Sequence, residues 1–251
     1  MIGKIIRAAD ITKDDLVIEI GPGIGSLTQF LAESAAKVIA VEIDKSLIPV
    51  LDDTLGGYDN IEIINEDILK VDLDKLLDTN YKNIKVVANL PYYITTPIIM
   101  NFLTARKKVN SMTVMMQKEV ANRIKASPKT KAYGSLTITV SYYAKVSLAA
   151  NVPQNCFIPR PNVDSAVLHL ELTENKDVKP KDEELMFAII RDAFAQRRKT
   201  LVNSVSNVNK SDISKEQLIE ILKSVGISEK ARAEELDLRQ YALLSDKIGG
   251  K

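Results

Sequence analysis

Short apolar runs alternate with helix-length segments along the first 145 residues. Five runs are rich in β-branched residues and end in polar or turn residues, as buried strands do: 16–21, 38–43, 61–67, 84–90 and 112–117. The intervening segments have helical spacing, and residues 26–36 place Leu27, Phe30 and Leu31 on one face. This alternation predicts an α/β fold with a mostly parallel sheet that helices cover on both faces.

Two further apolar stretches, 135–146 and 164–172, follow without a convincing helical segment between them. We therefore expect them to form an antiparallel pair at an edge of the sheet. The next stretch, 173–184, is polar and has no periodicity, which is typical of a linker.

The remainder of the chain is predicted to be helical. Apolar residues recur at helical spacing at 218, 221, 222 and 225, and Ser214 with Gln217 can form a capping box. Gly226 stands where a helix would end. We therefore expect an α/β domain over 1–174 and a small all-α domain over 175–251.

Composition narrows the class of protein. The chain has 251 residues, of which 45% are hydrophobic and 27% charged, and its net charge is +1. Its single cysteine, Cys156, excludes an internal disulfide and fits a reducing compartment, and a single histidine, His169, argues against histidine metal sites and histidine-dependent triads. No apolar run approaches the roughly 18 residues of a membrane span. We expect a cytoplasmic monomer without a metal or a membrane partner, in which Cys156 and His169 are structural.

Glycines follow the first predicted strand, and acidic residues stand at the ends of the first three. Gly21 and Gly23 allow a tight turn and close approach of a nucleotide-like ligand. Glu42 ends the second strand, where a carboxylate can accept hydrogen bonds from ribose hydroxyls. Asp67 ends the third strand, where it can accept from an adenine amine. Helix capping is the structural alternative for Glu42 and Asp67.

Two cofactors compete for this loop. The third glycine of the dinucleotide pattern is replaced by Ser26, and Glu19 inside the turn would face a pyrophosphate unfavourably. Glu19 suits a ligand that bears an amino group and a sulfonium. The loop therefore favours S-adenosylmethionine over a nicotinamide dinucleotide.

The fourth strand ends in Asn89, Leu90, Pro91 and Tyr92, which are typical of a site for an aromatic amine. The Asn89 side-chain oxygen and a backbone carbonyl near Leu90 can accept the two N–H groups of a base, and Tyr92 offers a ring for stacking. A strand-end turn in which Asn89 bonds its own backbone is the alternative. Phe157, in a proline-rich loop, is expected either to close over the base or to anchor that loop in the core.

The chain resembles the ribosomal RNA adenine dimethyltransferases, which have a Rossmann-like methyltransferase sheet. The resemblance covers nearly the whole chain, and NLPYYITTP and FAQRRKTL are most similar to the small-subunit branch; the other matching motifs, in order, are EIGPGIGSLT, VEID, NEDIL and FIPRPNVDSAV. It implies dimethylation of the exocyclic amines of two adjacent adenosines in a hairpin loop near the 3′ end of small-subunit rRNA, in the immature 30S particle. The methyl donor would be S-adenosyl-L-methionine and the product S-adenosyl-L-homocysteine.

The resemblance also implies residue roles. Carried over by position, the cofactor contacts are Glu19, Gly21, Gly23, Glu42, Ile43, Asp67, Ile68 and Asn89. The target base is expected at Asn89, Leu90, Pro91 and Tyr92, with Phe157 on the rim. Members of the family have a GQNFL-like segment before the position that Met1 occupies in this sequence. We therefore expect cofactor affinity to depend on residues of that segment.

Basic residues form four clusters: 106–108, 123 with 125, 129 with 131, and 197–199. Any one is consistent with solvated surface, but four favour a phosphate-binding face. Arg123, Arg197, Arg198 and Lys199 are the expected RNA contacts, although the last three could instead pin the helical domain to the α/β domain. The alternative functions are a large-subunit rRNA adenine methyltransferase, a DNA amino-methyltransferase and a non-catalytic assembly factor.

Overall fold

The computed structural model of the chain describes all residues except 78–79, 106–108, 158–159, 174–177, 206–212 and 251. The basic cluster 106–108 and part of the proline-rich loop therefore lie outside the described residues. The contacts within the chain divide it into two units. The sheet unit comprises Met1–Ala121 and Ala144–Thr173, and the helical unit comprises Asn122–Tyr143 and Glu174–Lys251.

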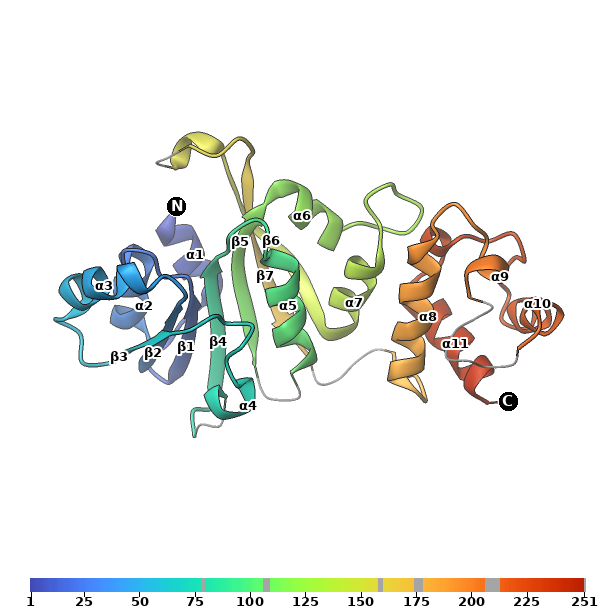
Figure 1. The fold of residues 1–251 in the computed structure, drawn as a ribbon, viewed down its shortest axis with the longest axis horizontal. Coiled ribbons are helices and arrows are strands. Elements are labelled where there is room, and N and C mark those ends of the chain that lie inside the picture. Colours follow the sequence, from blue (N-terminus) through green and yellow to red (C-terminus); the bar gives the residue numbers. More distant parts are fainter. Residues whose placement is uncertain (78–79, 106–108, 158–159, 174–177, 206–212, 251) are drawn as a thin grey trace. The chain divides into compact units, whose positions relative to one another are not determined.

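The sheet unit contains a seven-stranded sheet in the order β3-β2-β1-β4-β5-β7-β6 (Figure 1). Pairing is parallel from β3 to β5, whereas β7 runs antiparallel to both β5 and β6. The strands are β1 (Asp15–Ile20), β2 (Lys37–Glu42), β3 (Ile61–Asn65), β4 (Asn83–Asn89), β5 (Ser111–Gln117), β6 (Ala144–Val152) and β7 (Ser165–Leu172). The predicted α/β class and the mostly parallel sheet with an antiparallel edge are confirmed.

Helices connect these strands. They are α1 (Ile2–Ala9), α2 (Ser26–Ser34), α3 (Ile48–Leu55), α4 (Leu73–Leu76), α5 (Thr95–Thr104) and α6 (Lys118–Ile124), with short 3₁₀ turns at Lys45–Leu47 and Gln154–Cys156. All six residues of β1 are buried, which explains why four of them are apolar, while Asp15 and Glu19 are buried polar residues. On one face, Ile5 of α1 and Leu31 of α2 share a core cluster with Val17, Val87 and Met115 of the sheet.

The predicted strand over 135–146 is wrong in its larger part. Residues Ser135–Tyr143 form a helix, α7, and β6 begins only at Ala144. Residues on every side of α7 are buried, so its sequence has no polar face that would reveal helical periodicity. The lower helix propensity of its threonines and valine costs at most about 0.7 kcal/mol each, which burial outweighs.

The helical unit consists of α7 with α8 (Glu183–Ala195), α9 (Leu201–Ser204), α10 (Lys215–Ser224) and α11 (Leu238–Gly249) around one apolar core. The predicted capping box of α10 is present. Gly226 ends this helix with φ of 72°, and Ile227 N–H donates to Leu222 O at 2.9 Å. This left-handed glycine with its paired hydrogen bonds is a Schellman motif.

The domain boundary differs from the expectation in one respect. The predicted division between 174 and 175 lies one residue from the observed one, but Asn122–Tyr143 belongs to the helical unit although we expected it in the α/β domain. The hydroxyls of Tyr142 and Tyr143 both donate to Glu183 of α8, which explains why this segment groups with the later helices. The predicted linker has no helix or strand over 178–182, but α8 already begins at Glu183.

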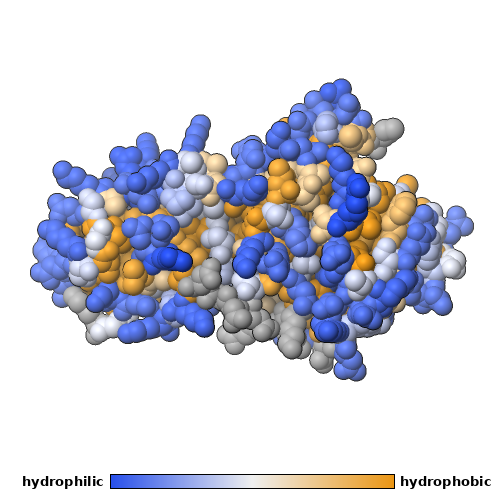
Figure 2. Space-filling view, turned by 180° about the vertical axis from the view of Figure 1, so that it is seen from behind, coloured by the Kyte–Doolittle hydropathy of each residue, from blue (hydrophilic) through white to orange (hydrophobic). Residues whose placement is uncertain are grey.

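The visible surface is largely hydrophilic (Figure 2), as expected for a chain with 27% charged residues. Figure 2 shows hydrophilic residues over most of the visible face, with hydrophobic residues exposed between them. In the part of the chain that the structure describes, no helix is long and apolar enough to cross a membrane.

Candidate functional site

The carboxyl ends of the central parallel strands meet at one edge of the sheet unit. A cavity of about 210 Å³ opens there, between the segments that follow β1, β2, β3 and β4. Eight of the predicted site residues line it: Gly21, Gly23, Glu42, Ile43, Asp67, Ile68, Asn89 and Pro91. Residues from four segments far apart in the sequence are thus brought together at the place where α/β sheets bind ligands.

The glycine loop after β1 depends on left-handed backbone. Gly21, Gly23 and Gly25 have φ of 68°, 62° and 86°. Gly21 N–H donates to Val41 O at 3.0 Å, which holds the loop against the end of β2. An added Cβ at Gly21 or Gly23 would meet no atom within 4 Å, so the backbone of both residues is open to close approach by a ligand.

Glu42 holds the loop from the neighbouring strand. Its side chain is 5% exposed and accepts from Gly23 N–H at 3.3 Å and from Asp44 N–H at 2.8 Å. Asp67 is half-buried and accepts from Leu69 N–H at 3.0 Å. Neither carboxylate caps a helix, because Asp44 caps the 3₁₀ turn after β2 and Asp72 caps α4, so the capping alternative is wrong for both, and both line the cavity.

Glu19 is buried under the loop rather than in the cavity wall. Its side chain is 1% exposed, and Oε2 has no hydrogen-bond partner among the described residues. Burial raises the pKa of Glu19 to about 7, and the negative charge of Glu42 contributes to this rise. A buried carboxylate in this state would be stabilised by a cationic ligand group.

The turn after β4 is held in place by backbone contacts. Leu90 is 1% exposed and donates its N–H to Met115 O at 3.1 Å. The Pro91 carbonyl accepts from Ile94 N–H at 3.2 Å and from the Thr95 hydroxyl at 3.1 Å. The exposed side chain of Asn89 lies at this fixed strand end and lines the cavity.

The two tyrosines of the turn have different environments. The Tyr92 hydroxyl lies 3.0 Å from Ser165 Oγ at the start of β7, and the half-buried Tyr92 is not among the cavity residues. Tyr93 is 85% exposed and does line the cavity. The predicted stacking role of Tyr92 remains a prediction, and Tyr93 is a second aromatic ring at the same place.

Phe157 does not line the cavity. It is half-buried and packs against the core cluster that contains Val152 and Val167. This position agrees with its alternative interpretation as an anchor of the loop, and a role on the rim of the base site remains a prediction.

The predicted RNA contacts lie in the helical unit. Arg197 donates from Nη2 to the carbonyls of Lys131 and Tyr133, at 3.2 and 3.1 Å, so it joins two segments of that unit. Arg123, Arg198 and Lys199 are exposed. Arg197 therefore has a structural use, and the side chains of the other three are open to solvent.

Sequence reasoning missed part of the cavity wall. Glu66, Tyr93, Ile94 and Ile98 line it without having been predicted. Glu66 precedes Asp67 in the same acidic run, and Ile94 and Ile98 are one helical turn apart at the start of α5, so both signals were present in the sequence. Among the described residues, no group of three or more histidine, cysteine, aspartate and glutamate side chains has an arrangement that could hold a metal.

Comparison with known proteins decides the family. The ribosomal RNA adenine dimethylase family model matches residues 1–248. The chain belongs to the ribosomal RNA adenine dimethylase family. The match includes the glycine loop, the Asn89 turn and the helical unit.

Bacterial members of this family are similar over almost the whole chain. Ribosomal RNA small subunit methyltransferase A of Lachnoclostridium phytofermentans is 54% identical over 99% of this chain and 87% of that protein. The protein of the same name in Clostridioides difficile is 46% identical over 100% of this chain and 87% of that protein.

Solved structures show the same fold. A dimethyladenosine transferase from Plasmodium falciparum superposes with a TM-score of 0.82 at 29% identity, covering 97% of this chain and 93% of that one. The 23S rRNA methyltransferase ErmE superposes with a TM-score of 0.72 at 25% identity, covering 99% of this chain and 96% of that one.

Proposed function

We propose that this protein transfers methyl groups from S-adenosyl-L-methionine to the exocyclic amines of two adjacent adenosines in a 3′-terminal hairpin loop of small-subunit (16S) rRNA. The observation that carries the proposal is the position of Asn89 and Pro91, which share one cavity with the glycine loop and with Glu42. Bacterial relatives named for the small subunit, at 46–54% identity, support that subunit over the large one.

The residues present fit the proposed cofactor. The open backbone of Gly21 and Gly23 can approach its nucleoside, and the Glu42 carboxylate can accept from ribose hydroxyls. The unpaired Glu19 Oε2 is suited to the amino group of the methionine part. When bound, the cofactor supplies a methyl group on a sulfonium, which needs no activation by the protein.

The role of the protein is to orient a weak nucleophile. The lone pair of an adenine amine is delocalised into the ring, so the amine attacks only if its geometry becomes tetrahedral. The Asn89 side-chain oxygen and the Leu90 carbonyl would accept its two N–H groups and hold the nitrogen in line with the methyl carbon. The bound cofactor would supply its methyl group to this nitrogen and leave as S-adenosyl-L-homocysteine, and the amine proton would pass to water.

A hairpin loop is a physically favourable target. Its bases are splayed and accessible, so the enzyme avoids much of the cost of flipping a base out of a duplex. We propose that the substrate is the immature 30S particle and that the protein acts as a cytoplasmic monomer. The helical unit, with Arg123, Arg198 and Lys199 exposed, would contact rRNA phosphates.

The decisive test is mass spectrometry of adenosines after incubation with unmethylated small-subunit particles and S-adenosylmethionine. We expect dimethyladenosine at two adjacent positions from the wild-type protein. Methylation of large-subunit RNA instead would move the protein to the other branch of the family. Absence of methylation on both RNAs, with retained particle binding, would favour a non-catalytic assembly factor.

Replacement of Asn89 tests the proposed chemistry. Asn89→Ala removes one acceptor for the amine, and loss of one such oriented hydrogen bond costs about 100- to 1,000-fold in rate. The control is Asn151→Ala, which removes an exposed amide from β6. Equal activity of the two variants, or a fall in thermal stability that accounts for the loss of activity, would contradict the role of Asn89.

A further inference from the structure

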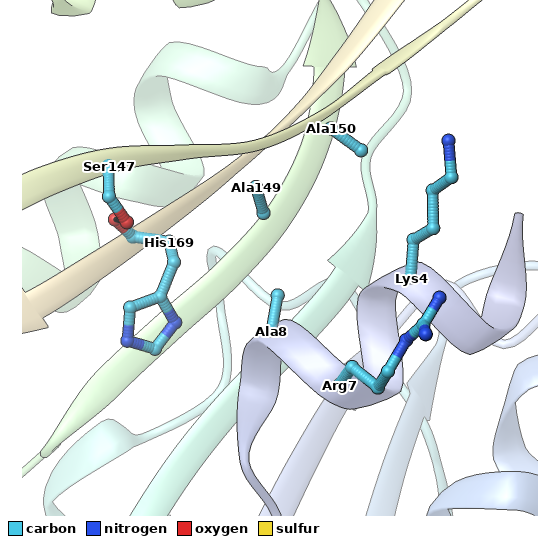
Figure 3. Close-up of a pocket in the computed structure, with 7 residues that line it drawn as sticks. All are labelled: Lys4, Arg7, Ala8, Ser147, Ala149, Ala150 and His169. Carbon is cyan, nitrogen blue, oxygen red and sulfur yellow. Dashed lines mark hydrogen bonds between the residues drawn. The ribbon is translucent and has the colours of Figure 1, made fainter.

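A second hollow lies in the sheet unit, away from the residues of the proposed active site. It has a volume of about 500 Å³ and lies between α1 and the strands β6, at the edge of the sheet, and β7, its neighbour. Figure 3 shows Lys4 and Arg7 extending from α1 on one side and Ser147 and His169 on the sheet side. Small side chains lie between them, namely Ala8, Ala149 and Ala150, so the groove is shallow-walled and open.

The α1 side of this groove is positively charged. Lys4 and Arg7 are three residues apart, which places them on one side of the helix, and both are exposed. Arg7 Nε donates to Gly3 O at 3.1 Å, which fixes the guanidinium group near its own helix. In the described part of the chain, no ion pair joins either cation to an acidic residue. Their charges are therefore available to an anionic ligand.

The sheet side of the groove supplies hydrogen bonding rather than charge. His169 Nδ1 lies 2.9 Å from Thr113 Oγ1, so Nε2 is the ring nitrogen left for a ligand. Burial lowers the pKa of His169, which favours the neutral ring. Glu171 and Asp10 act to raise the pKa of His169 and Lys85 acts to lower it, so two acids and one cation face the ring on this side.

The groove leads toward the end of the sheet where the target base is expected. Figure 1 shows the N-terminus at the same end of the sheet as the connection between β6 and β7. The strand pairing gives the distance between His169 and Asn89. Met115 of β5 pairs with Asn89 of β4 on one side and with Val167 of β7 on the other, and His169 lies two residues beyond Val167. His169 is thus about 10 Å across the sheet from β4 and about 7 Å along the strands from the level of Asn89.

We propose that this groove binds phosphodiester groups of the substrate RNA, a few nucleotides from the target adenosines. The inference rests on the proposed function, since it extends the RNA contact from the target base to the adjoining backbone. Two cations about 4.5 Å apart along α1 suit successive contacts with a backbone, and an open groove admits a polymer that passes through it. Ser147 and His169, which supply hydrogen-bonding groups on the sheet side, would face the sugars of the same RNA strand.

The test compares two double variants with the same change in net charge. Lys4→Gln/Arg7→Gln removes the two groove cations, and Lys75→Gln/Lys82→Gln removes two exposed cations from the segments before β4 in the same unit. Binding is measured against an unmethylated small-subunit rRNA fragment containing the hairpin loop, at several salt concentrations. We expect the groove variant to bind about tenfold more weakly than the control variant. The slope of log Kd against log salt should fall by about 1.4 for two lost phosphate contacts on a single strand.

Several outcomes separate this inference from the proposed function. A raised KM for RNA with unchanged kcat and unchanged cofactor affinity would support the groove. Equal Kd and equal salt slope for the two variants would overturn it, even if the wild-type protein methylates the rRNA normally. Weaker binding to assembled particles but not to naked rRNA would also overturn it, and would point to an acidic protein segment. Failure of the wild-type protein to bind or methylate this rRNA would instead refute the proposed function.

Discussion

Glu19 shows how a single buried residue can connect cofactor binding to pH. It lies in a strand whose residues are all buried, and one of its carboxylate oxygens has no partner among the described residues. An acid whose pKa is raised by folding stabilises the native state fully only below its ordinary value near 4.5. That stabilisation is lost as the pH rises through about 7.

Glu19→Gln should therefore change the pH dependence of stability. The difference in free energy of unfolding, variant minus wild type, should increase by about 2–3 kcal/mol between pH 5 and pH 8. Chemical denaturation at both pH values measures this difference, and parallel pH profiles would contradict it. Affinity for S-adenosylmethionine should increase from pH 6 to pH 8 in the wild type only, because ionised Glu19 would pair with the amino group of the cofactor.

Glu42 is the second acidic residue whose role can be separated by mutation. Glu42→Ala removes a carboxylate that lines the cavity and holds Gly23 and Asp44. Hydrogen bonds to a charged group are worth about 1.5–3 kcal/mol, so cofactor affinity should fall about 10- to 100-fold. RNA affinity should change little, and Glu62→Ala on β3 is the control at an exposed acid. Unchanged cofactor affinity in isothermal titration would refute the ribose assignment.

At the scale of elements, the loop between β1 and α2 depends on its last glycine for packing as well as for conformation. A Cβ at Gly25 would lie 3.0 Å from Leu55 Cδ2 and 3.1 Å from Thr54 Oγ1, both in α3. Thr54 Oγ1 also donates to Ile24 O at 3.1 Å. The close approach of this loop to α3 thus fixes one side of the cavity.

Gly25→Ala should destabilise the protein more than Gly226→Ala. Both residues have positive φ, which costs an alanine about 1–2 kcal/mol, but only Gly25 has neighbouring atoms that must move. Thermal unfolding of the two variants gives the comparison, since Gly226 has no atom within 4 Å of the added Cβ. Equal loss of stability would show that α3 shifts without cost.

At the scale of the whole molecule, the helical unit is built from two separate parts of the chain. Tyr133 and Tyr142 come from the first part, and their rings contact Phe194 and Phe187 of α8. Tyr133 also donates its hydroxyl to Leu236 O at 2.9 Å. The unit is thus continuous in space although the strands β6 and β7 interrupt it in the sequence.

A fragment of residues 1–174 should therefore fold incompletely. It retains α7 but lacks α8–α11, so Ile138 and Tyr142, which are 0% and 4% exposed in the whole chain, would be uncovered. Hydrogen exchange should show loss of amide protection over 135–143 while β1–β5 remain protected. Protection of α7 equal to that in the whole chain would show that the helix does not need its partners.

Most strands were predictable because a strand that is buried on both faces has mainly apolar residues. The runs that became β1, β2, β4 and β5 are mainly apolar, and the observed bounds lie within one residue of the predicted ones. The acids and Asn89 were predictable for a related reason, because a polar residue directly after such a run must lie at the end of the sheet. Tyr93 carried no comparable signal, since an aromatic residue near a turn fits a core equally well.

The sequence by itself determined the α/β class, the helical C-terminal region and the cluster of polar residues at the carboxyl ends of the parallel strands. Periodicity and strand-end chemistry are local properties, so they can be read without knowing what lies nearby. Only the tertiary structure decided that 135–143 is a helix, that Arg197 bonds the carbonyls of Lys131 and Tyr133, and that Lys4, Arg7 and His169 share a groove. Each of these features depends on contacts between residues distant in the chain, which no local pattern records.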